Sequence, residues 1–423
     1  MTDLSVGRWP LIQKILFRFA FTYFTLFIIF ENNGAFPLWD WVMKYPTEGL
    51  HIFIPWIGKN IIRLSYEITT FTNGSGDTTY DYVIVLCCLV GAMGSAIIWS
   101  ILDRHRENYQ RLYYWLTVAV RFYVGLMLIN YGLYKVIKVQ FPDPNVYRLT
   151  QMYGDSTPMG LAWTFLGFST GYNLFMGIAE VAAVLLLVRR TMTIGAIITL
   201  MTTANVMAVN YFYDVPVKIL STHLVLMTLL LLLHDAKALW KFFAKGDSVR
   251  LEVIPLPSFP KRWIRIVGLS FKFLLIGYAL FYGAYEVMGY QRQYANFGKG
   301  EFDGYYVVKK FTSNSGKPVD KNWKRMSIIF NQYATVTLMN DSTVRFTISK
   351  DSLNRKMWLI GSKDTTVRCN FIYTHLDSTK FQFKGTIMKD SASITFDKLK
   401  DFQKHFKLTN TGFHWINEFP NNR

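Results

Sequence analysis

Long apolar runs recur through the first two thirds of the chain and are absent from its last third. Each run approaches the roughly 20 residues that an α-helix needs to cross a bilayer. The first run is followed by Glu31-Asn32-Asn33 rather than by a small-residue cleavage site, so it is not read as a cleavable signal. The pattern predicts a helical integral membrane bundle with about seven spans: Leu11–Phe30, Tyr82–Leu102, Tyr113–Val136, Met159–Val188, Thr191–Phe212, Val217–His234 and Trp263–Val287.

One segment between the first two runs mixes aliphatic and polar residues. From about Glu48 to Asn73, Trp56, Lys59 and Arg63 stand among apolar residues at helical spacing. An amphipathic helix that lies in the outer membrane interface accounts for this mixture better than an eighth span does.

The last third of the chain changes to short runs in which apolar and polar residues alternate, a pattern typical of half-buried strands. Eight closely spaced strands predict a C-terminal all-β domain that forms a small meander barrel, with a β-sandwich as the competing topology. The expected strands are Tyr305–Val308, Met326–Phe330, Ala334–Met339, Val344–Ser349, Met357–Ile360, Val367–Tyr373, Phe381–Met388 and Ala392–Phe396. The barrel interior could hold a small apolar ligand, although a filled core is commoner. The aromatic and polar string at 411–418 either docks the tail or is an ordinary exposed terminus.

These patterns divide the chain into four parts. Residues 1–112 hold two spans and the interfacial helix, 113–235 hold a four-span core, 236–296 hold a basic loop and the last span, and 297–423 form the β-rich domain.

Basic residues concentrate in alternate loops between the apolar runs. They precede or open the first span and lie between spans two and three, four and five, and six and seven. The rule that loops rich in Lys and Arg stay in the cytoplasm then predicts a multi-pass inner-membrane protein, with a cytoplasmic N-terminus and an external, periplasmic β-domain. The residues concerned are Arg8, Lys14, Arg18, Arg104, Arg106, Arg111, Arg189, Arg190, Lys237, Lys241, Lys245, Arg250, Lys261, Arg262 and Arg265.

The amino-acid composition agrees with the apolar pattern and limits the kinds of binding partner that we expect. Only 17% of the residues are charged, against about 25% in soluble proteins. The net charge is +18, and the tail from Phe297 carries 21 basic and 11 acidic residues. No nucleic-acid-binding motif accompanies this charge, so membrane lipid is the expected partner, with a solvated lysine-rich surface as the alternative. The three cysteines form no Cys-x-x-Cys pair, and we expect them to be packing residues with no metal bound.

Two charged residues within the predicted spans are expected to meet. Arg121 lies eight residues after Tyr113, and Glu180 lies nine residues before Arg189. At about 1.5 Å per residue, both lie roughly 12–14 Å from the cytoplasmic end of their spans. Because unpaired charges are costly within a membrane, we predict a structural ion pair between Arg121 and Glu180.

A second polar group is expected in the outer half of the bundle, where residues of three spans have similar depths. We predict a pocket with Lys135, His223 and Asp214 as catalytic candidates. A Lys in a low-dielectric site can act as a base, and a neutral His can relay protons. Lys135 could instead extend to the interface, and His223 could be a packing residue. Polar and aromatic groups suited to binding a quinone-like ring or a lipid head group are Asn130, Tyr134, Asn205, Asn210 and Tyr211.

The four-span block from about Tyr113 to Asp235 resembles the DoxX family. The likeness rests on Arg121-Phe122, on a helix ending Asn130-Tyr131-Gly132-Leu133-Tyr134-Lys135, on Gly177-Ile178-Ala179-Glu180, and on Arg189-Arg190-Thr191 with Gly195. The string Tyr213-Asp214-Val215-Pro216-Val217-Lys218, followed by His223, is similar to a longer DoxX-like subfamily with added spans and a tail. A more remote likeness, to the membrane domain of vitamin K-dependent carboxylase-like proteins, rests on Gly132 and Lys135.

The resemblance implies a four-helix membrane bundle, in a family that includes a subunit of a thiosulfate:quinone oxidoreductase. The chain departs from a redox role in lacking paired external thiols and any haem or iron–sulfur ligand set. Two hypotheses follow. Either the bundle binds a quinone or lipid in its outer half, a role that would suit a component of a membrane oxidoreductase, or the protein is a non-catalytic envelope protein whose external domain binds a partner protein or a ligand.

Overall fold

A computed structural model describes residues 7–70, 76–255, 261–297, 300–314, 322–412 and 414–415. The chain divides into two compact units, and each is assembled from two segments. The helical unit comprises Met1–Gln140 and Thr170–Val287. The barrel unit comprises Phe141–Ser169 and Met288–Arg423. This division differs from the four predicted parts, because residues 141–169 belong with the C-terminal barrel rather than with the predicted four-span core.

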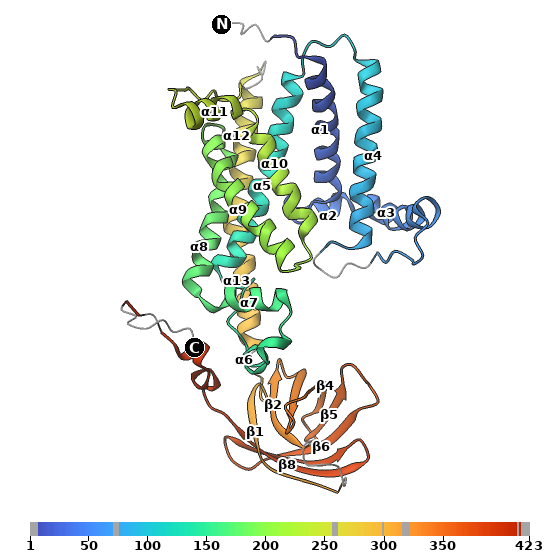
Figure 1. The fold of residues 1–423 in the computed structure, drawn as a ribbon, viewed down its shortest axis with the longest axis vertical. Coiled ribbons are helices and arrows are strands. Elements are labelled where there is room, and N and C mark those ends of the chain that lie inside the picture. The colour runs from blue at the N-terminus through green and yellow to red at the C-terminus, as the bar shows by residue number, and fades with distance from the viewer. Residues whose placement is uncertain are drawn as a thin grey trace. The chain divides into compact units, whose positions relative to one another are not determined.

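The helical unit is built around α5 (Gln110–Val136), whose buried residues cover the whole circumference of its middle turns. Helix α1 (Leu11–Phe30) packs against α4 (Thr79–Leu102) and α5, as Figure 1 shows. Helices α8 (Thr170–Val181) and α10 (Lys218–Leu232) also pack on α5, and α9 (Met192–Phe212) packs on α10. A helix that is apolar on all sides is expected at the centre of such a bundle.

Several helices have the length and apolarity of membrane spans, as expected of a membrane protein. Within the described ranges, six single helical stretches qualify, and α10 followed by α11 (Ala236–Lys245), bent by 81°, forms a possible seventh. The six are Leu11–Phe30, Thr79–Leu102, Gln110–Val136, Thr170–Leu187, Arg189–Phe212 and Arg262–Ala295. The last consists of α12 (Arg262–Gly277), η5 (Tyr278–Tyr282) and most of α13 (Gly283–Phe297).

The predicted fourth span, Met159–Val188, is wrong as a single helix. Thr157 caps α7 (Pro158–Phe168), and Ser169 then adopts an extended conformation that ends it. Helix α7 belongs to the barrel unit, so the candidate span begins only at Thr170. The span continues beyond α8 as a 3₁₀ helix, η3 (Ala182–Leu187), before the short turn η4 (Arg189–Thr191). Continuous apolar character concealed the break because neither Pro nor a charge marks Ser169.

The predicted interfacial segment is helical in its first half. Helix α3 (Lys44–Ile57) follows the short α2 (Trp39–Val42) and continues as a π-helical turn, η1 (Gly58–Ile62). Arg63, with a φ of 61°, ends the helix. Asn73, the predicted end, lies outside the described residues. The segment is not among the candidate spans, and its place in the membrane interface stays a prediction.

The barrel unit contains the predicted closed, eight-stranded antiparallel barrel, in which each strand pairs with its sequence neighbours and β1 pairs with β8. All eight predicted strands are confirmed, with ends shifted by a few residues. They are β1 (Gly304–Ser313), β2 (Trp323–Ile329), β3 (Tyr333–Leu338), β4 (Thr343–Asp351), β5 (Lys356–Gly361), β6 (Arg368–His375), β7 (Lys380–Ile387) and β8 (Asp390–Lys398). The sandwich alternative is therefore wrong.

Large side chains pack together in the barrel interior. Trp323, Phe371, Phe383 and Phe396 are at least 95% buried and their rings contact one another. Burial raises the pKa of the Cys369 thiol, which packs with this core, to about 12. These contacts favour the filled-core interpretation over a ligand-holding interior.

Short helices complete the barrel unit. Before α7 come α6 (Val146–Thr150), which contacts β2, and η2 (Tyr153–Asp155). After β8 come η7 (Phe402–His405) and α14 (Lys407–Asn410). Phe413 and residues 416–418 of the aromatic and polar string lie outside the described residues.

Candidate functional site

Two glycines bring α5 and α8 into backbone contact. A Cβ atom added to Gly177 would lie 2.7 Å from the carbonyl oxygen of Gly132, and one added to Gly132 would lie 2.8 Å from the carbonyl oxygen of Gly177. Farther along, Gly125 lies against Ala183 and Leu187, so the two helices run antiparallel. Small residues at helix crossings allow this close approach in membrane proteins.

A buried ion pair lies one helical turn beyond each glycine. Lys135 Nζ lies 2.5 Å from Oε1 and 2.6 Å from Oε2 of Glu180. Lys135 is 5% exposed and Glu180 is 2% exposed. The ammonium also lies 5.8 Å from the centre of the Tyr131 ring. Each charge is thus compensated in a place where an isolated charge would be costly.

The predicted pairing of Arg121 with Glu180 is not what the structure contains. Arg121 Nε donates to the backbone oxygen of Leu186, 2.5 Å away, six residues beyond Glu180 on the way to Arg189. The depth comparison failed because α5 begins at Gln110, three residues before the Tyr113 from which depth was counted, and because Arg121 lies level with Leu186. In addition, η3 rises about 2.0 Å per residue, more than an α-helix. The two helix ends were therefore not at one level.

His223 of α10 is held against α1. Its Nδ1 atom lies 2.7 Å from the backbone oxygen of Ile219, and its Nε2 atom lies 2.7 Å from the Tyr23 hydroxyl. The ring stacks on Phe27 at 3.7 Å between centres. Because a carbonyl oxygen only accepts, Nδ1 carries a proton, and in the neutral ring Nε2 accepts from Tyr23. Tyr23 and His223 therefore form a hydrogen-bonded couple between two helices.

An apolar groove of about 500 Å³ lies along the later turns of α10 and the start of α11, and neither Tyr23 nor His223 lines it. Phe24, which contacts the Tyr23 ring at 5.6 Å between centres, forms one wall. Six leucines and one alanine of α10, α11 and the turn between them form the other wall: Leu226, Leu229, Leu230, Leu232, Leu233, Ala236 and Leu239. The volume is in the range of small-molecule sites.

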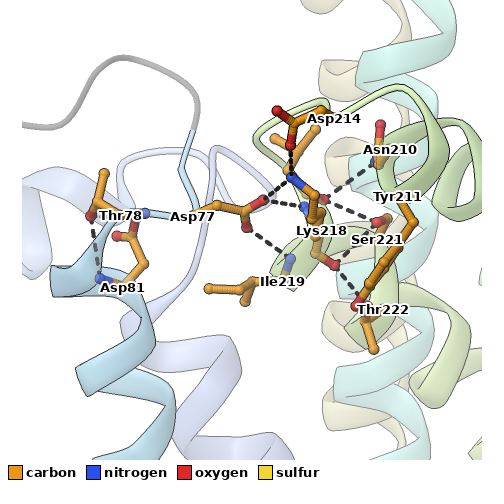
Figure 2. Close-up of polar contacts among 11 residues, drawn as sticks. Asp77, Thr78, Asp81, Asn210, Tyr211, Asp214, Lys218, Ile219, Ser221 and Thr222 are labelled. Atoms are coloured by element: carbon orange, nitrogen blue, oxygen red, sulfur yellow. Dashed lines mark hydrogen bonds and ion pairs between the residues drawn. The ribbon is translucent and has the colours of Figure 1, made fainter. Parts of the chain in front are cut away.

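A third polar group surrounds the N-terminal end of α10 (Figure 2). The Asp77 carboxylate accepts from the backbone nitrogens of Lys218 and Ile219 at 2.7 and 2.9 Å. Lys218 Nζ forms a 2.9 Å ion pair with Asp214, which is largely exposed. Asp77 thus satisfies free amide groups at a helix N-terminus, where a negative charge is favourable.

The other residues that were predicted to line one pocket also contact different partners instead of one another. Asn210 Nδ2 donates to the backbone oxygen of Val217, and the Tyr211 hydroxyl lies 3.0 Å from that of Thr222 (Figure 2). Asn205 is exposed, whereas Asn130 and Tyr134 are half-buried. Lys135, His223 and Asp214 thus belong to three contact groups, each with partners of its own, instead of the single group that similar depth predicted.

Sequence reasoning missed Tyr23, Asp77 and Glu31. Glu31 directly follows α1, and burial, together with the negative charge of Asp81, raises its pKa to about 7. The Tyr123 hydroxyl donates to the backbone oxygen of Glu31. Next to Asp77, Thr78 and Asp81 form a capping box, a sequence signal that marks the start of α4. No local signal places Asp77 beside residue 218, because that contact joins segments 141 residues apart.

The fold combines a helical unit, whose candidate membrane-spanning helices suggest a membrane protein, with a second unit that contains a closed eight-stranded β-barrel. The chain belongs to the same family as YwoB of Bacillus subtilis strain 168, which is described as an uncharacterized protein. The two are 37% identical over 126 residues, which cover 29% of this chain and 79% of YwoB. No family model and no solved structure matches the chain.

Proposed function

We propose that this protein is a DoxX-like protein of the inner membrane that binds a quinone, or a lipid with a comparable polar head, between α1 and α10. The observation that carries the proposal is an apolar groove of about 500 Å³ along α10, which has Phe24 of α1 in its wall, one residue after the Tyr23 that bonds to His223. The groove suits an isoprenoid or acyl chain. A ring or head group that extends beyond it along α10 toward His223 would meet the Tyr23 hydroxyl, which can accept a further hydrogen bond, whereas both nitrogens of His223 already have partners. This position replaces the predicted outer cluster around Lys135 and Asp214.

The same couple suits a component of a membrane oxidoreductase. Reduction of a quinone to a quinol takes up two electrons and two protons. The Tyr23 hydroxyl is the group that would pass a proton to a quinone oxygen; it must then be reprotonated from solvent, and the second proton of the quinol must also come from solvent. We assign the supply of electrons to a partner protein, which must present its own redox group.

Retention of the ligand tests the proposal. The full chain, purified in mild detergent, should co-purify with a quinone or lipid that mass spectrometry identifies. Tyr23→Phe and His223→Gln should each lower the amount retained by about tenfold, which corresponds to about 1.4 kcal/mol, or one hydrogen bond.

The control for this experiment is Asn205→Ala, which changes an exposed polar residue and should leave retention unaltered. Equal retention in all variants would contradict the proposal. A loss of retention that only follows a loss of thermal stability would identify the couple as a packing feature.

For orientation, we propose a cytoplasmic N-terminus and an external barrel unit. Contacts that support it join the basic loops at one end of the helical unit: Lys14 Nζ to the Arg106 oxygen, Tyr113 to His234, and Arg189 to the Ile254 oxygen. Helix α10 runs from the Asp77 end to this basic end, which favours counting it as a seventh span. Seven spans place the two termini on opposite sides.

The orientation can be measured with protease added to intact spheroplasts. The barrel unit should be degraded while the helical unit stays protected. A barrel that resists until the membrane is opened with detergent, although purified protein is cleaved, would contradict the orientation.

A further inference from the structure

The barrel unit contains a polar cavity outside the barrel itself. The segment of α6 and η2 covers the outer face of β2, β3 and β4 and encloses about 270 Å³. The cavity lies wholly within one compact unit, and its lining is dominated by Arg, Thr and Asp side chains. Its volume is somewhat below that of most small-molecule sites, so it suits a compact charged group.

Strand register places its donors in two adjacent rows. Arg325 of β2 stands opposite Thr337 of β3, which stands opposite Thr343 of β4. In the next outward-facing row, two positions along, Thr335 of β3 stands opposite Arg345 of β4. Directly opposed residues lie about 4.5–5.5 Å apart. Two guanidinium groups therefore lie at diagonal corners of a patch whose other positions carry hydroxyl groups.

Two of these residues, Arg325 and Thr337, present buried polar groups to the cavity. Arg325 Nε is buried and has no hydrogen-bond partner within the described part of the chain. Thr337 is only 5% exposed, although it points outward from the barrel. Nearly all buried polar groups in native proteins have a partner, so an unpartnered guanidinium donor facing a polar cavity points to a bound acceptor.

Arg345 is fixed from the opposite wall. Its guanidinium carbon lies 4.9 Å from the centre of the Tyr147 ring, and Nη2 donates to the Tyr147 hydroxyl. This contact orients the arginine while the remaining donors of its five N–H groups stay available.

Two acidic residues also line the cavity, so their charges must be counted. Asp341 accepts a 2.7 Å hydrogen bond from Lys324, which lowers the pKa of its carboxyl and offsets its charge. Asp155 lies in η2 and is exposed to solvent, where its charge is screened. The electrostatic potential on the strand side of the cavity is therefore positive and is determined by Arg325 and Arg345.

We propose that this cavity binds a phosphate group, held by Arg325 and Arg345 with hydroxyl donors from the threonines between them. Arginine forks pair with phosphate oxygens through two parallel hydrogen bonds. The phosphate can belong to a small soluble molecule or to a lipid head group, and both present the same oxygens. The site is separate from the quinone or lipid site proposed between α1 and α10.

Two binding measurements on the full chain in mild detergent test the proposal. In the first, equilibrium dialysis measures the binding of radiolabelled inorganic phosphate. In the second, native mass spectrometry measures the binding of phosphatidic acid. Arg325→Gln and Arg345→Gln should each weaken binding at least tenfold. Thr337→Val should weaken it severalfold, and Arg325→Lys should be intermediate because it keeps the charge but loses the fork.

Arg368→Gln provides the matched control, since Arg368 is an exposed arginine on β6 that does not line the cavity. Saturable phosphate binding that is lost in the arginine variants supports a soluble ligand, whereas loss confined to phosphatidic acid supports a lipid head group. The proposal is overturned if neither probe binds, or if Arg368→Gln weakens binding as much as Arg325→Gln. Thr337→Val and Arg325→Lys, the mildest changes, decide the matter if the Gln variants fail to fold.

Discussion

Lys135→Met is expected to destabilise the helical unit by about 3–5 kcal/mol, because Glu180 would stay buried without its partner. The pair is 5% and 2% exposed, so water cannot replace the lost ammonium. The measurement is reversible unfolding of the full chain in mild detergent, followed by a signal from the aromatic residues of the helical unit. Glu180→Gln together with Lys135→Met should recover much of the loss, since it removes both charges.

Two control variants test whether Lys135 is the specific partner of Glu180. Lys138→Met changes a part-exposed lysine near the same helix end, bonded to Thr170, and should cost well under 1 kcal/mol. Arg121→Ala combined with Glu180→Gln should show additive effects, because Arg121 bonds to Leu186 instead. Coupling between Arg121 and Glu180 as strong as that between Lys135 and Glu180 would contradict the observed pairing.

Gly177→Ala is expected to destabilise the same unit by about 1–3 kcal/mol, the usual cost of overpacking. The new Cβ would lie 2.7 Å from the Gly132 oxygen and 2.8 Å from the Val136 nitrogen, and these backbone atoms cannot rotate away. The helices must therefore separate, which would also lengthen the Lys135–Glu180 pair. Unfolding in detergent measures the stability.

Gly94→Ala is the matched control for that substitution. Gly94 lies within α4, and a Cβ there would have no neighbour within 4 Å. Alanine favours helix more than glycine by about 1 kcal/mol, so this variant should be neutral or slightly more stable. If Gly177→Ala were equally harmless, the close contact between α5 and α8 would not be present in solution.

Local patterns predicted the elements that depend on local physics. The strand from Thr343 to Ile348 alternates strictly between polar and apolar residues, and alternation follows from the two-residue period of a strand. Its neighbours follow the same rule, so the barrel could be predicted strand by strand. Apolar length likewise located most spans.

Relations between elements could not be predicted in the same way. Depth counted from the helix ends predicted that Glu180 pairs with Arg121. Its actual partner is Lys135, because the close contact of Gly132 with Gly177 brings that part of α5 next to α8. The Tyr23–His223 contact joins residues 200 positions apart. No periodicity within either helix carries that information, because it arises only when α1 and α10 pack.

The two-segment make-up of the barrel unit constrains the order in which the protein can be completed during synthesis. Residues 141–169 leave the ribosome before α8, α9 and α10, yet β2, which α6 contacts, begins only at Trp323. About 150 residues, most of them in the helical unit, must therefore be translated before that strand is available to α6. A nascent chain stalled before residue 288 would expose that early segment to proteases and chaperones. A separately expressed fragment of residues 297–423 would lack α6 and η2, and with them one wall of the phosphate cavity.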